Sequence, residues 1–296
     1  MKRNNTFKAI YDKMNSDDAL PSRFPYVIDV ELTNKCNLSC NFCSRQFMKR
    51  PQGFMIDSTF GKIMDEIEEI KIPIRFIRWG EPFLHPKILT YANNITKRGI
   101  PLHITTNGLL LNEETCEKLI VSEIDSIIFS MQGANKDEYK SSRVGGDYDL
   151  LSDNIKNISR MRGNDEKPYM AITTTISQKQ GKNKEKFIRY WKQYVDDVKV
   201  GVTNLSRINN FKGKHIICKE PWQKFGIDWD GEVSACCGDY DRLMNIGNIN
   251  EQSLYNLWNN NSVLDSYRNL ISYGKHDSLS LCSKCYPAHG NVWEND

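Results

Sequence analysis

Residues 26–43 read YVIDVELTNKCNLSCNFC, and this stretch decides the fold. The apolar run at residues 26–32 predicts a β-strand that leads directly into a loop with three cysteines, Cys36, Cys40 and Cys43. Their spacing is Cx3Cx2C. In a chain that stays in a reducing compartment, clustered cysteines favour metal ligation or catalysis over disulfides. We therefore expect a metal-binding loop at the end of the first strand.

Outward from this strand, strand-like and helix-like segments alternate. Further strands are predicted at 73–79, 101–106, 126–131, 170–176 and 198–203, and helices with apolar residues at helical spacing at 58–71, 86–98, 112–121, 147–161 and 185–195. Such alternation implies parallel strands joined by right-handed crossovers. Six units are fewer than the eight of a closed barrel. We predict an α/β fold, a partial (β/α)6 TIM-like barrel, with ligands at the C-terminal ends of the strands.

The chain is predicted to have three parts. Residues 1–24 form an N-terminal extension with one helix followed by an extended entry, and residues 25–215 form the barrel. After about residue 215 the alternation stops, and turn residues, aromatic residues and cysteines follow. Residues 216–296 are therefore predicted to be a small cysteine-rich, metal-stapled domain.

Composition excludes several classes of function. Of 296 residues, 39% are hydrophobic and 26% are charged, as in ordinary globular proteins. The net charge of +3 is too small to favour nucleic acid or an anionic membrane as a partner. No apolar stretch is long enough to span a membrane, and no apolar segment follows the basic start as in a secretion signal. We expect a cytoplasmic protein.

Three thiolates on one short loop suit a [4Fe–4S] cluster whose fourth iron stays open to another ligand. The alternative, a structural zinc site, would lack one ligand. The loop, including Phe42 before the last cysteine, resembles that of the radical S-adenosylmethionine (SAM) superfamily. The resemblance implies that Cys36, Cys40 and Cys43 hold a cluster that binds and cleaves SAM to a 5′-deoxyadenosyl radical, which abstracts hydrogen from a substrate. It also implies an electron donor such as flavodoxin or ferredoxin.

A second segment, Trp79-Gly80-Glu81-Pro82, follows the second predicted strand and resembles the family's GGEP motif. Trp79 stands where the motif has its first glycine. The resemblance implies that Gly80 and Glu81 lie at the SAM ammonium group, where a carboxylate or a backbone carbonyl accepts a charge-assisted hydrogen bond. By itself, Gly-Glu-Pro would indicate only a loop.

Three further positions extend the resemblance. Thr105-Thr106-Asn107-Gly108 ends the third strand and is similar to the family's TNG turn, although Asn-Gly alone is only a turn signal. Ser130 ends the fourth strand, where the family often reads S-x-D-G and this chain has Gln132 in place of the acid. The resemblance implies that Asn107 belongs to the SAM site and that Ser130 and Arg143 hold the SAM carboxylate. A surface arginine is the alternative for Arg143.

The tail carries Cys218, Cys236, Cys237, Cys282 and Cys285, and resembles SPASM/Twitch extensions that bind auxiliary iron–sulfur clusters. A full SPASM domain holds two clusters and needs more cysteines. The resemblance here implies one auxiliary [4Fe–4S] cluster, ligated by Cys218, Cys236, Cys282 and Cys285. A four-cysteine zinc site is the alternative. With every iron ligated, the cluster is expected to pass an electron rather than to bind substrate.

Three other residues have competing interpretations. Cys237 is either the ligand in place of Cys236, a small buried residue, or a hydrogen-atom donor as in some radical SAM epimerases. Cys116 lies on the apolar face of a predicted helix, which favours core packing. His103 lies on a strand that points toward the barrel mouth, so it is a candidate substrate contact, with a solvated or core role as the alternative.

The leading hypothesis for the reaction is dehydrogenation of a small hydroxylated, sugar-like molecule, because the length and the tail resemble the aminocyclitol dehydrogenases. The radical would take hydrogen from a carbinol carbon, a base would take the hydroxyl proton, and the auxiliary cluster would accept an electron. Arg207 and Asp239 are candidate bases, with an ion pair or a turn as the alternative. Epimerisation with Cys237 returning hydrogen, peptide modification, and a non-catalytic metal-binding module are the other possibilities, and the SAM-site matches argue against the last.

Overall fold

The computed structural model describes residues 3–16, 22–177, 183–203 and 217–285. Within these ranges, nine strands form one sheet in the order β6-β5-β4-β3-β2-β1-β7-β8-β9. The strands are β1 (Val27–Val30), β2 (Ile74–Phe76), β3 (Leu102–Thr106), β4 (Ser126–Ser130), β5 (Tyr169–Ser177), β6 (Asp197–Thr203), β7 (Lys224–Ile227), β8 (Glu232–Ser234) and β9 (Asn245–Asn248).

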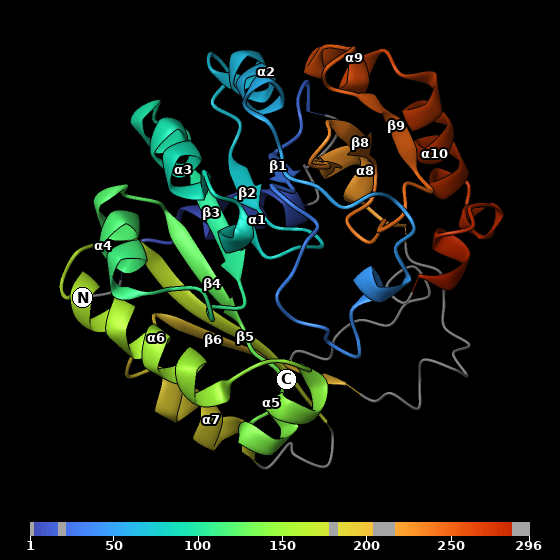
Figure 1. Cartoon of the computed structure of the whole chain (residues 1–296). Helices are drawn as coiled ribbons and strands as arrows, with labels where there is room; N and C mark the ends of the chain where they lie inside the picture. Colours follow the sequence, from blue (N-terminus) through green and yellow to red (C-terminus); the bar gives the residue numbers. More distant parts are fainter. Residues whose placement is uncertain (1–2, 17–21, 178–182, 204–216, 286–296) are drawn as a thin grey trace.

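Helices connect these strands, and Figure 1 shows α3, α4 and α6 along one side of the sheet. The helices are α1 (Thr6–Asn15), η1 (Ser44–Phe47), α2 (Asp57–Ile67), η2 (Pro82–Leu84), α3 (Ile88–Lys97), α4 (Glu113–Val121), α5 (Lys136–Ser142), α6 (Tyr148–Arg162), α7 (Lys184–Trp191), α8 (Glu220–Gln223), α9 (Leu254–Asn259), α10 (Ser262–Ser272), η5 (His276–Ser278) and η6 (Cys282–Lys284). Cys116 on α4 is fully buried, so the prediction of core packing is confirmed.

The predicted partial barrel is confirmed. All six predicted strands are present, and β1 to β6 pair in parallel in the order of the chain. The sheet does not close, because β6 and β9 lie at its two ends. Each of the five predicted barrel helices is found within a few residues of its expected bounds, and the helix predicted within residues 1–24 is α1, whereas the seven-residue α5 was not predicted.

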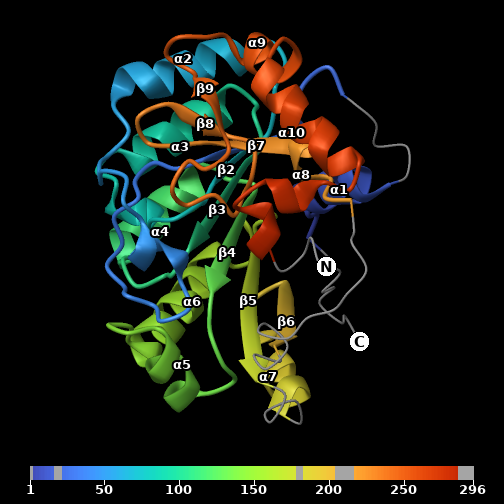
Figure 2. The same ribbon diagram turned by 90° about the vertical axis from the view of Figure 1, so that its right-hand side faces the viewer.

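The tail continues the sheet of the barrel, which the sequence did not indicate. Strand β7 pairs in parallel with β1, and β8 and β9 follow in antiparallel order. Figure 2 shows these strands with α9 and α10 beside the barrel strands. The metal-stapled tail is therefore joined to the barrel by backbone hydrogen bonds along β1.

Alternate residues of β1 face two different environments. Ile28 and Val30 belong to the main hydrophobic core. Asp29 lies between them and points to the opposite, inner face, as expected from the period-2 geometry of a strand. There the Arg75 guanidinium donates two hydrogen bonds to the Asp29 carboxylate, of 2.5 and 2.6 Å. Arg75 also donates to the Tyr11 hydroxyl at 2.7 Å, so α1 packs across the N-terminal end of the inner face.

His103 lies in the same row of the inner face, opposite Arg75 in the sheet register. Its ring nitrogens lie 2.7 Å from the Ser126 hydroxyl and 2.9 Å from the Thr105 hydroxyl, and its ring packs on Phe7 of α1. Burial and the nearby Arg75 charge lower the pKa of His103 to about 3. The core role of His103 is therefore the correct interpretation, and its candidacy as a substrate contact is wrong.

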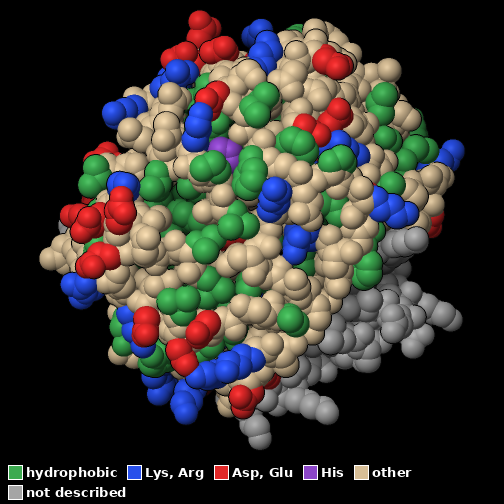
Figure 3. Space-filling model, in the orientation of Figure 1, with side chains coloured by type: hydrophobic (Ala, Val, Ile, Leu, Met, Phe, Trp, Pro, Cys, Tyr) green, Lys and Arg blue, Asp and Glu red, His purple; other side chains and the backbone are tan. Residues whose placement is uncertain are grey.

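Charged side chains on the surface are mixed. In the face shown in Figure 3, Lys and Arg side chains alternate with Asp and Glu side chains around the rim, and apolar side chains show between them. No helix in the described part of the chain is both long enough and apolar enough to cross a membrane.

The first prediction concerns the buried Asp29–Arg75 pair. Arg75→Leu should reduce the free energy of unfolding by about 3–5 kcal/mol, because it leaves the Asp29 carboxylate buried without its partner. Urea unfolding measures this change. The double variant Asp29→Leu/Arg75→Leu should recover most of the loss, whereas additive losses in the double variant would show that the pairing is not the cause.

The same pair predicts a pH dependence. Burial would raise the pKa of Asp29, but the adjoining Arg75 guanidinium outweighs burial and holds it below its usual value. The pair therefore contributes fully to stability above the pH at which an unfolded aspartate titrates, and the contribution falls as the pH drops through the folded pKa. Acid titration of unfolding should show this loss in the wild type and not in the double variant.

Candidate functional site

The cysteine loop at 36–43 follows β1 and is held in place from its outer side. The amide of Ser39 donates to the carbonyl of Val144 at 2.9 Å, and the amide of Asn41 donates to the carbonyl of Ser142 at 3.0 Å. Both acceptors lie at or just beyond the C-terminal end of α5. The short helix that the sequence did not predict therefore positions the loop that carries the three thiols.

Polar groups surround the thiols of this loop. Burial raises the pKa of Cys36 and of Cys40. An Arg143 guanidinium nitrogen lies 3.9 Å from the Cys40 sulfur, and the side-chain nitrogen Nδ2 of Asn107 lies 4.0 Å from the Cys36 sulfur. Hydrogen-bond donors and a positive charge stabilise thiolates, the form that ligates metal. The donor set fits a [4Fe–4S] cluster.

Gly80 brings the Gly-Glu-Pro segment against the strand that leads into the cysteine loop. A Cβ atom on residue 80 would lie 1.9 Å from the carbonyl oxygen of Thr33, a distance that no side chain can occupy. The next amide, that of Glu81, donates to the carbonyl of Lys35 at 2.9 Å. Only glycine therefore permits this close approach, one residue before Cys36.

The Glu81 carboxylate joins three loops. It accepts hydrogen bonds from the Thr106 hydroxyl at 2.7 Å, the Asn107 amide at 2.7 Å and the Phe83 amide at 3.2 Å. Burial outweighs these bonds and raises the pKa of Glu81. The Asn107 side chain in turn donates to the Asn37 side-chain oxygen at 2.7 Å. The predicted residues Gly80, Glu81 and Asn107 thus meet beside the cysteine loop.

Arg143 lies on the other side of the cysteine loop, beside the end of β4. Its guanidinium donates to the carbonyl of Met131, the residue after Ser130, at 3.3 Å, and lies 5.4 Å from the centre of the Phe42 ring. The structure thus brings Phe42, Ser130 and Arg143 into one neighbourhood with Cys40. The buried Nε of Arg143 has no hydrogen-bond partner among the described residues. A bound acceptor such as a carboxylate would satisfy it.

The tail cysteines also gather. Cys218 precedes α8, the adjacent pair Cys236 and Cys237 follows β8, Cys282 begins η6, and Cys285 follows it. Burial raises the pKa of Cys218 to about 12, with the nearby Cys237 and Cys285 thiols adding to the rise. Burial, together with Cys285, raises the pKa of Cys282 to about 11. Segments far apart in the sequence therefore supply thiols to one place.

The adjacent cysteines differ in their contacts. The Cys236 sulfur accepts a hydrogen bond from the Gly238 amide at 3.3 Å. A hydrogen bond with the Cys236 thiol raises the pKa of Cys237, and it is Cys237 that interacts electrostatically with Cys218. The assignment of Cys236 as ligand, with Cys237 as the alternative, stays a prediction.

Of the two candidate bases, Arg207 lies outside the described residues. The Asp239 carboxylate is buried and accepts hydrogen bonds from the Ser234 hydroxyl at 2.9 Å and from the amides of Leu243 and Met244 at 2.9 and 2.8 Å. These donors all come from its own loop. The contacts fit the turn alternative for Asp239, in which the carboxylate organises the segment after Cys237.

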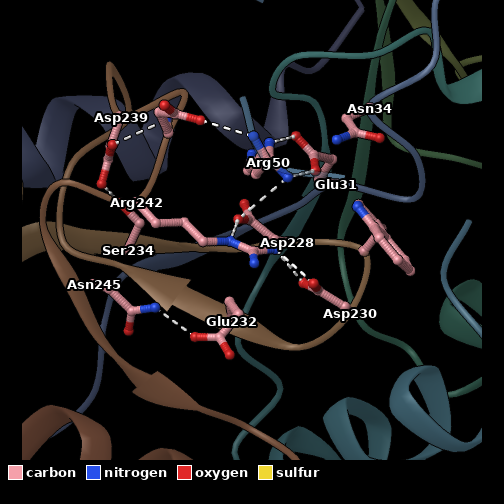
Figure 4. A network of polar contacts seen from close by, with 12 residues as sticks. Glu31, Asn34, Arg50, Asp228, Asp230, Glu232, Ser234, Asp239, Arg242 and Asn245 are labelled. Carbon is pink, nitrogen blue, oxygen red and sulfur yellow. Dashed lines mark hydrogen bonds and ion pairs between the residues drawn. The ribbon is translucent and has the colours of Figure 1, made fainter. Parts of the chain in front are cut away.

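Sequence reasoning missed a buried ion-pair network between barrel and tail (Figure 4). The Arg50 guanidinium donates to both Glu31 carboxylate oxygens at 2.7 and 2.6 Å and lies 3.3 Å from Asp228, which follows β7. Arg242 pairs with Asp228 at 3.0 Å. Glu31, a charged residue within the strand predicted at residues 26–32, was the available signal.

Comparison with known proteins extends these observations. The chain is 24% identical to the S-adenosyl-L-methionine-dependent 2-deoxy-scyllo-inosamine dehydrogenase of Niallia circulans, over 88% of this chain and 92% of that protein. It is 38% identical to the tungsten-containing aldehyde ferredoxin oxidoreductase cofactor-modifying protein of Pyrococcus furiosus, over 34% of this chain and only 29% of that protein. The structure of BtrN in complex with AdoMet and 2-DOIA has a similar fold, with a TM-score of 0.64 and 20% identity over 92% of this chain and 95% of that chain.

Two family profiles match the chain. The iron–sulfur cluster-binding SPASM domain matches residues 218–286, and the radical SAM superfamily matches residues 30–203. Together they imply a SAM-binding [4Fe–4S] cluster and an auxiliary [4Fe–4S] cluster. Because the second profile spans more than half of the chain and includes the Cx3Cx2C loop, this protein belongs to the radical SAM superfamily.

Proposed function

We propose that this enzyme dehydrogenates a small hydroxylated, sugar-like molecule. The observation that carries the proposal is the extent of the match to the inosamine dehydrogenase, which spans 88% of this chain and 92% of that protein. The match to the tungsten cofactor-modifying protein is closer in identity but spans only 34% of this chain.

A [4Fe–4S] cluster held by Cys36, Cys40 and Cys43 would supply the electron for cleavage of SAM to the hydrogen-abstracting 5′-deoxyadenosyl radical, and an auxiliary cluster held by the tail cysteines would supply an electron acceptor. The protein's own residues would orient SAM from two sides. The backbone and carboxylate of Glu81 lie on the side of Cys36, where the ammonium group is expected. The unpartnered Nε of Arg143 lies on the side of Cys40 and would hold the carboxylate.

Hydroxyl groups on the inner face support a polar, hydroxylated substrate. Thr105, Ser130, Thr173 and Thr175 are half-buried, and the sheet register places them on the same face as His103. All four lie in the C-terminal halves of β3, β4 and β5, where barrel enzymes bind ligands. Each hydroxyl both donates and accepts hydrogen bonds, as the hydroxyl groups of a sugar or an aminocyclitol require.

Oxidation of a carbinol to a carbonyl removes one hydrogen atom, one proton and one electron. The 5′-deoxyadenosyl radical formed from SAM would take the hydrogen atom, and the auxiliary cluster would be the acceptor of the electron. The contacts of the Asp239 carboxylate favour a structural role over proton removal, and Arg207 stays a prediction as the base. An electron donor such as flavodoxin or ferredoxin and a cytoplasmic location also stay predictions.

The first-cluster assignment predicts a specific loss. Anaerobically reconstituted protein should hold about eight irons per chain, at four per cubane, and Cys36→Ala should hold fewer, down to about four. With SAM and dithionite, Cys36→Ala should form no 5′-deoxyadenosine above background. The control Cys116→Ala removes a buried thiol of α4 and should keep both properties. Full 5′-deoxyadenosine formation by Cys36→Ala would refute the assignment.

The reaction type is tested with 2-deoxy-scyllo-inosamine and related aminocyclitols in D2O. Dehydrogenation should give a carbonyl product without solvent deuterium at the reacting carbon and with one SAM consumed per product. An epimerase would instead return a stereoisomer with deuterium at that carbon, and Cys237→Ala would abolish the return step while 5′-deoxyadenosine still formed. Activity only on a peptide would contradict the proposal.

A further inference from the structure

Residue 79 sets this chain apart from the motif that it resembles, because a tryptophan replaces glycine directly before Gly80 and Glu81. The Trp79 side chain extends from the SAM side to the tail. Its indole N–H donates to the carbonyl of Asp239 at 3.0 Å, and its ring contacts the Tyr240 ring edge-on, with centroids 5.8 Å apart. Asp239 and Tyr240, the two residues that Trp79 contacts, lie within three residues of Cys237 in the sequence.

The neighbouring Arg78 makes a second bond to the same carbonyl. Its guanidinium lies 3.2 Å from the Asp239 oxygen and 3.1 Å from the Asp228 carboxylate, and its side chain is only 2% exposed. Arg78 has φ of 103°, which costs a non-glycine residue on the order of 1–3 kcal/mol. A strained, buried residue therefore helps to hold this contact.

Glycine at position 226 makes room for that guanidinium. A Cβ atom on Gly226 would lie 1.5 Å from Nη1 of Arg78, so a larger residue in β7 would displace the guanidinium from this place. The contact between residues 78–79 and the tail thus depends on features of both parts of the chain.

A separate barrel segment holds the other end of the same tail loop. The Asp241 carboxylate accepts hydrogen bonds from the amides of Lys49 and Arg50 at 2.8 and 2.9 Å, and the carbonyl of Tyr240 accepts from the Arg50 guanidinium at 2.9 Å. Three consecutive residues, 239–241, are therefore bonded to two barrel segments. One segment follows Cys43, and the other precedes Glu81.

We infer that Trp79 is a positioning residue for the auxiliary cluster. It holds the loop at 236–241, which carries one cluster ligand, at a fixed place beside the SAM-binding loop, and so sets the environment in which the auxiliary cluster takes up its electron. The effect of Trp79 on the auxiliary cluster, the redox part of this inference, rests on the proposed function, in which that cluster accepts an electron. The effect of Trp79 on the position of the loop at 236–241, the positional part, is independent of the proposed function.

The positional part is tested on the reduced, metal-free protein. In Trp79→Gly, the thiols of Cys236 and Cys237 should react with iodoacetamide about three- to tenfold faster, as expected when a hydrogen bond and a ring contact that close a loop are lost. Mass spectrometry measures the rate of alkylation at each cysteine. The thiols of Cys36, Cys40 and Cys43 serve as internal references and should keep their rates.

Matched variants separate positioning from general packing. Trp229 also donates its indole N–H to a barrel carbonyl, that of Pro51 at 3.3 Å, but it does not contact the loop at 236–241 in any bond described. Trp229→Phe should leave all rates unchanged, and Trp79→Phe, which keeps a ring against Tyr240, should give a smaller increase than Trp79→Gly. Unchanged rates in Trp79→Gly, or equal increases at both cysteine sets, would overturn the inference.

The redox part is tested in the Cys36→Ala background, where only the auxiliary cluster is fully ligated. Potentiometric titration followed by electron paramagnetic resonance should show a shifted midpoint potential in Trp79→Phe and no shift in Trp229→Phe. An unshifted potential would overturn the redox part. Neither measurement requires turnover, so failure of the dehydrogenase proposal would be recognised separately, as absence of product in the wild type.

Discussion

The arrangement of this enzyme depends on one buried guanidinium, that of Arg50. It follows the cysteine loop in the chain and lies between Glu31 at the end of the first strand and Asp228 after the seventh. Charges taken out of water must be paired, and removing one partner from such a pair is strongly destabilising. The positions of barrel and tail are therefore fixed by charge pairing as well as by the shared sheet. Two cysteine regions about 180–250 residues apart in the chain are thereby brought together.

Most of the barrel could be predicted because its signals are local. Six strands with regular apolar patterns alternate with amphipathic helices, and each was found near its expected place. Strand β7 was missed because Gly226 interrupts its apolar residues and it shows no period of its own. Its place in the sheet is set by pairing with β1, in which Asp29 is the partner of Gly226 although it is distant in sequence. Local pattern reasoning does not detect such pairings.

In the candidate site, too, local sequence signals predict some residues and not others. The three thiols of the cysteine loop follow from spacing alone, and the Gly-Glu-Pro and Thr-Asn-Gly segments from short motifs. The role of Asp239 could not be predicted, because its partners include backbone amides of the following turn, which carry no sequence signature. Nor could the choice between Cys236 and Cys237, since both lie in one peptide and only their surroundings differ. The hydroxyls that we propose as substrate contacts are dispersed over three strands, so no motif identifies them.

The close packing of Gly226 against Arg78 has a consequence for how such sequences vary. A Cβ atom at position 226 would lie in the space that the Arg78 guanidinium occupies, so a substitution there displaces the guanidinium from its bonds. Relatives that carry a larger residue in β7 are expected to lack the arginine, and with it the strained backbone at that point. Arg78 and Gly226 are nearly 150 positions apart in the sequence. Their joint presence would then identify the relatives in which barrel and tail share this contact.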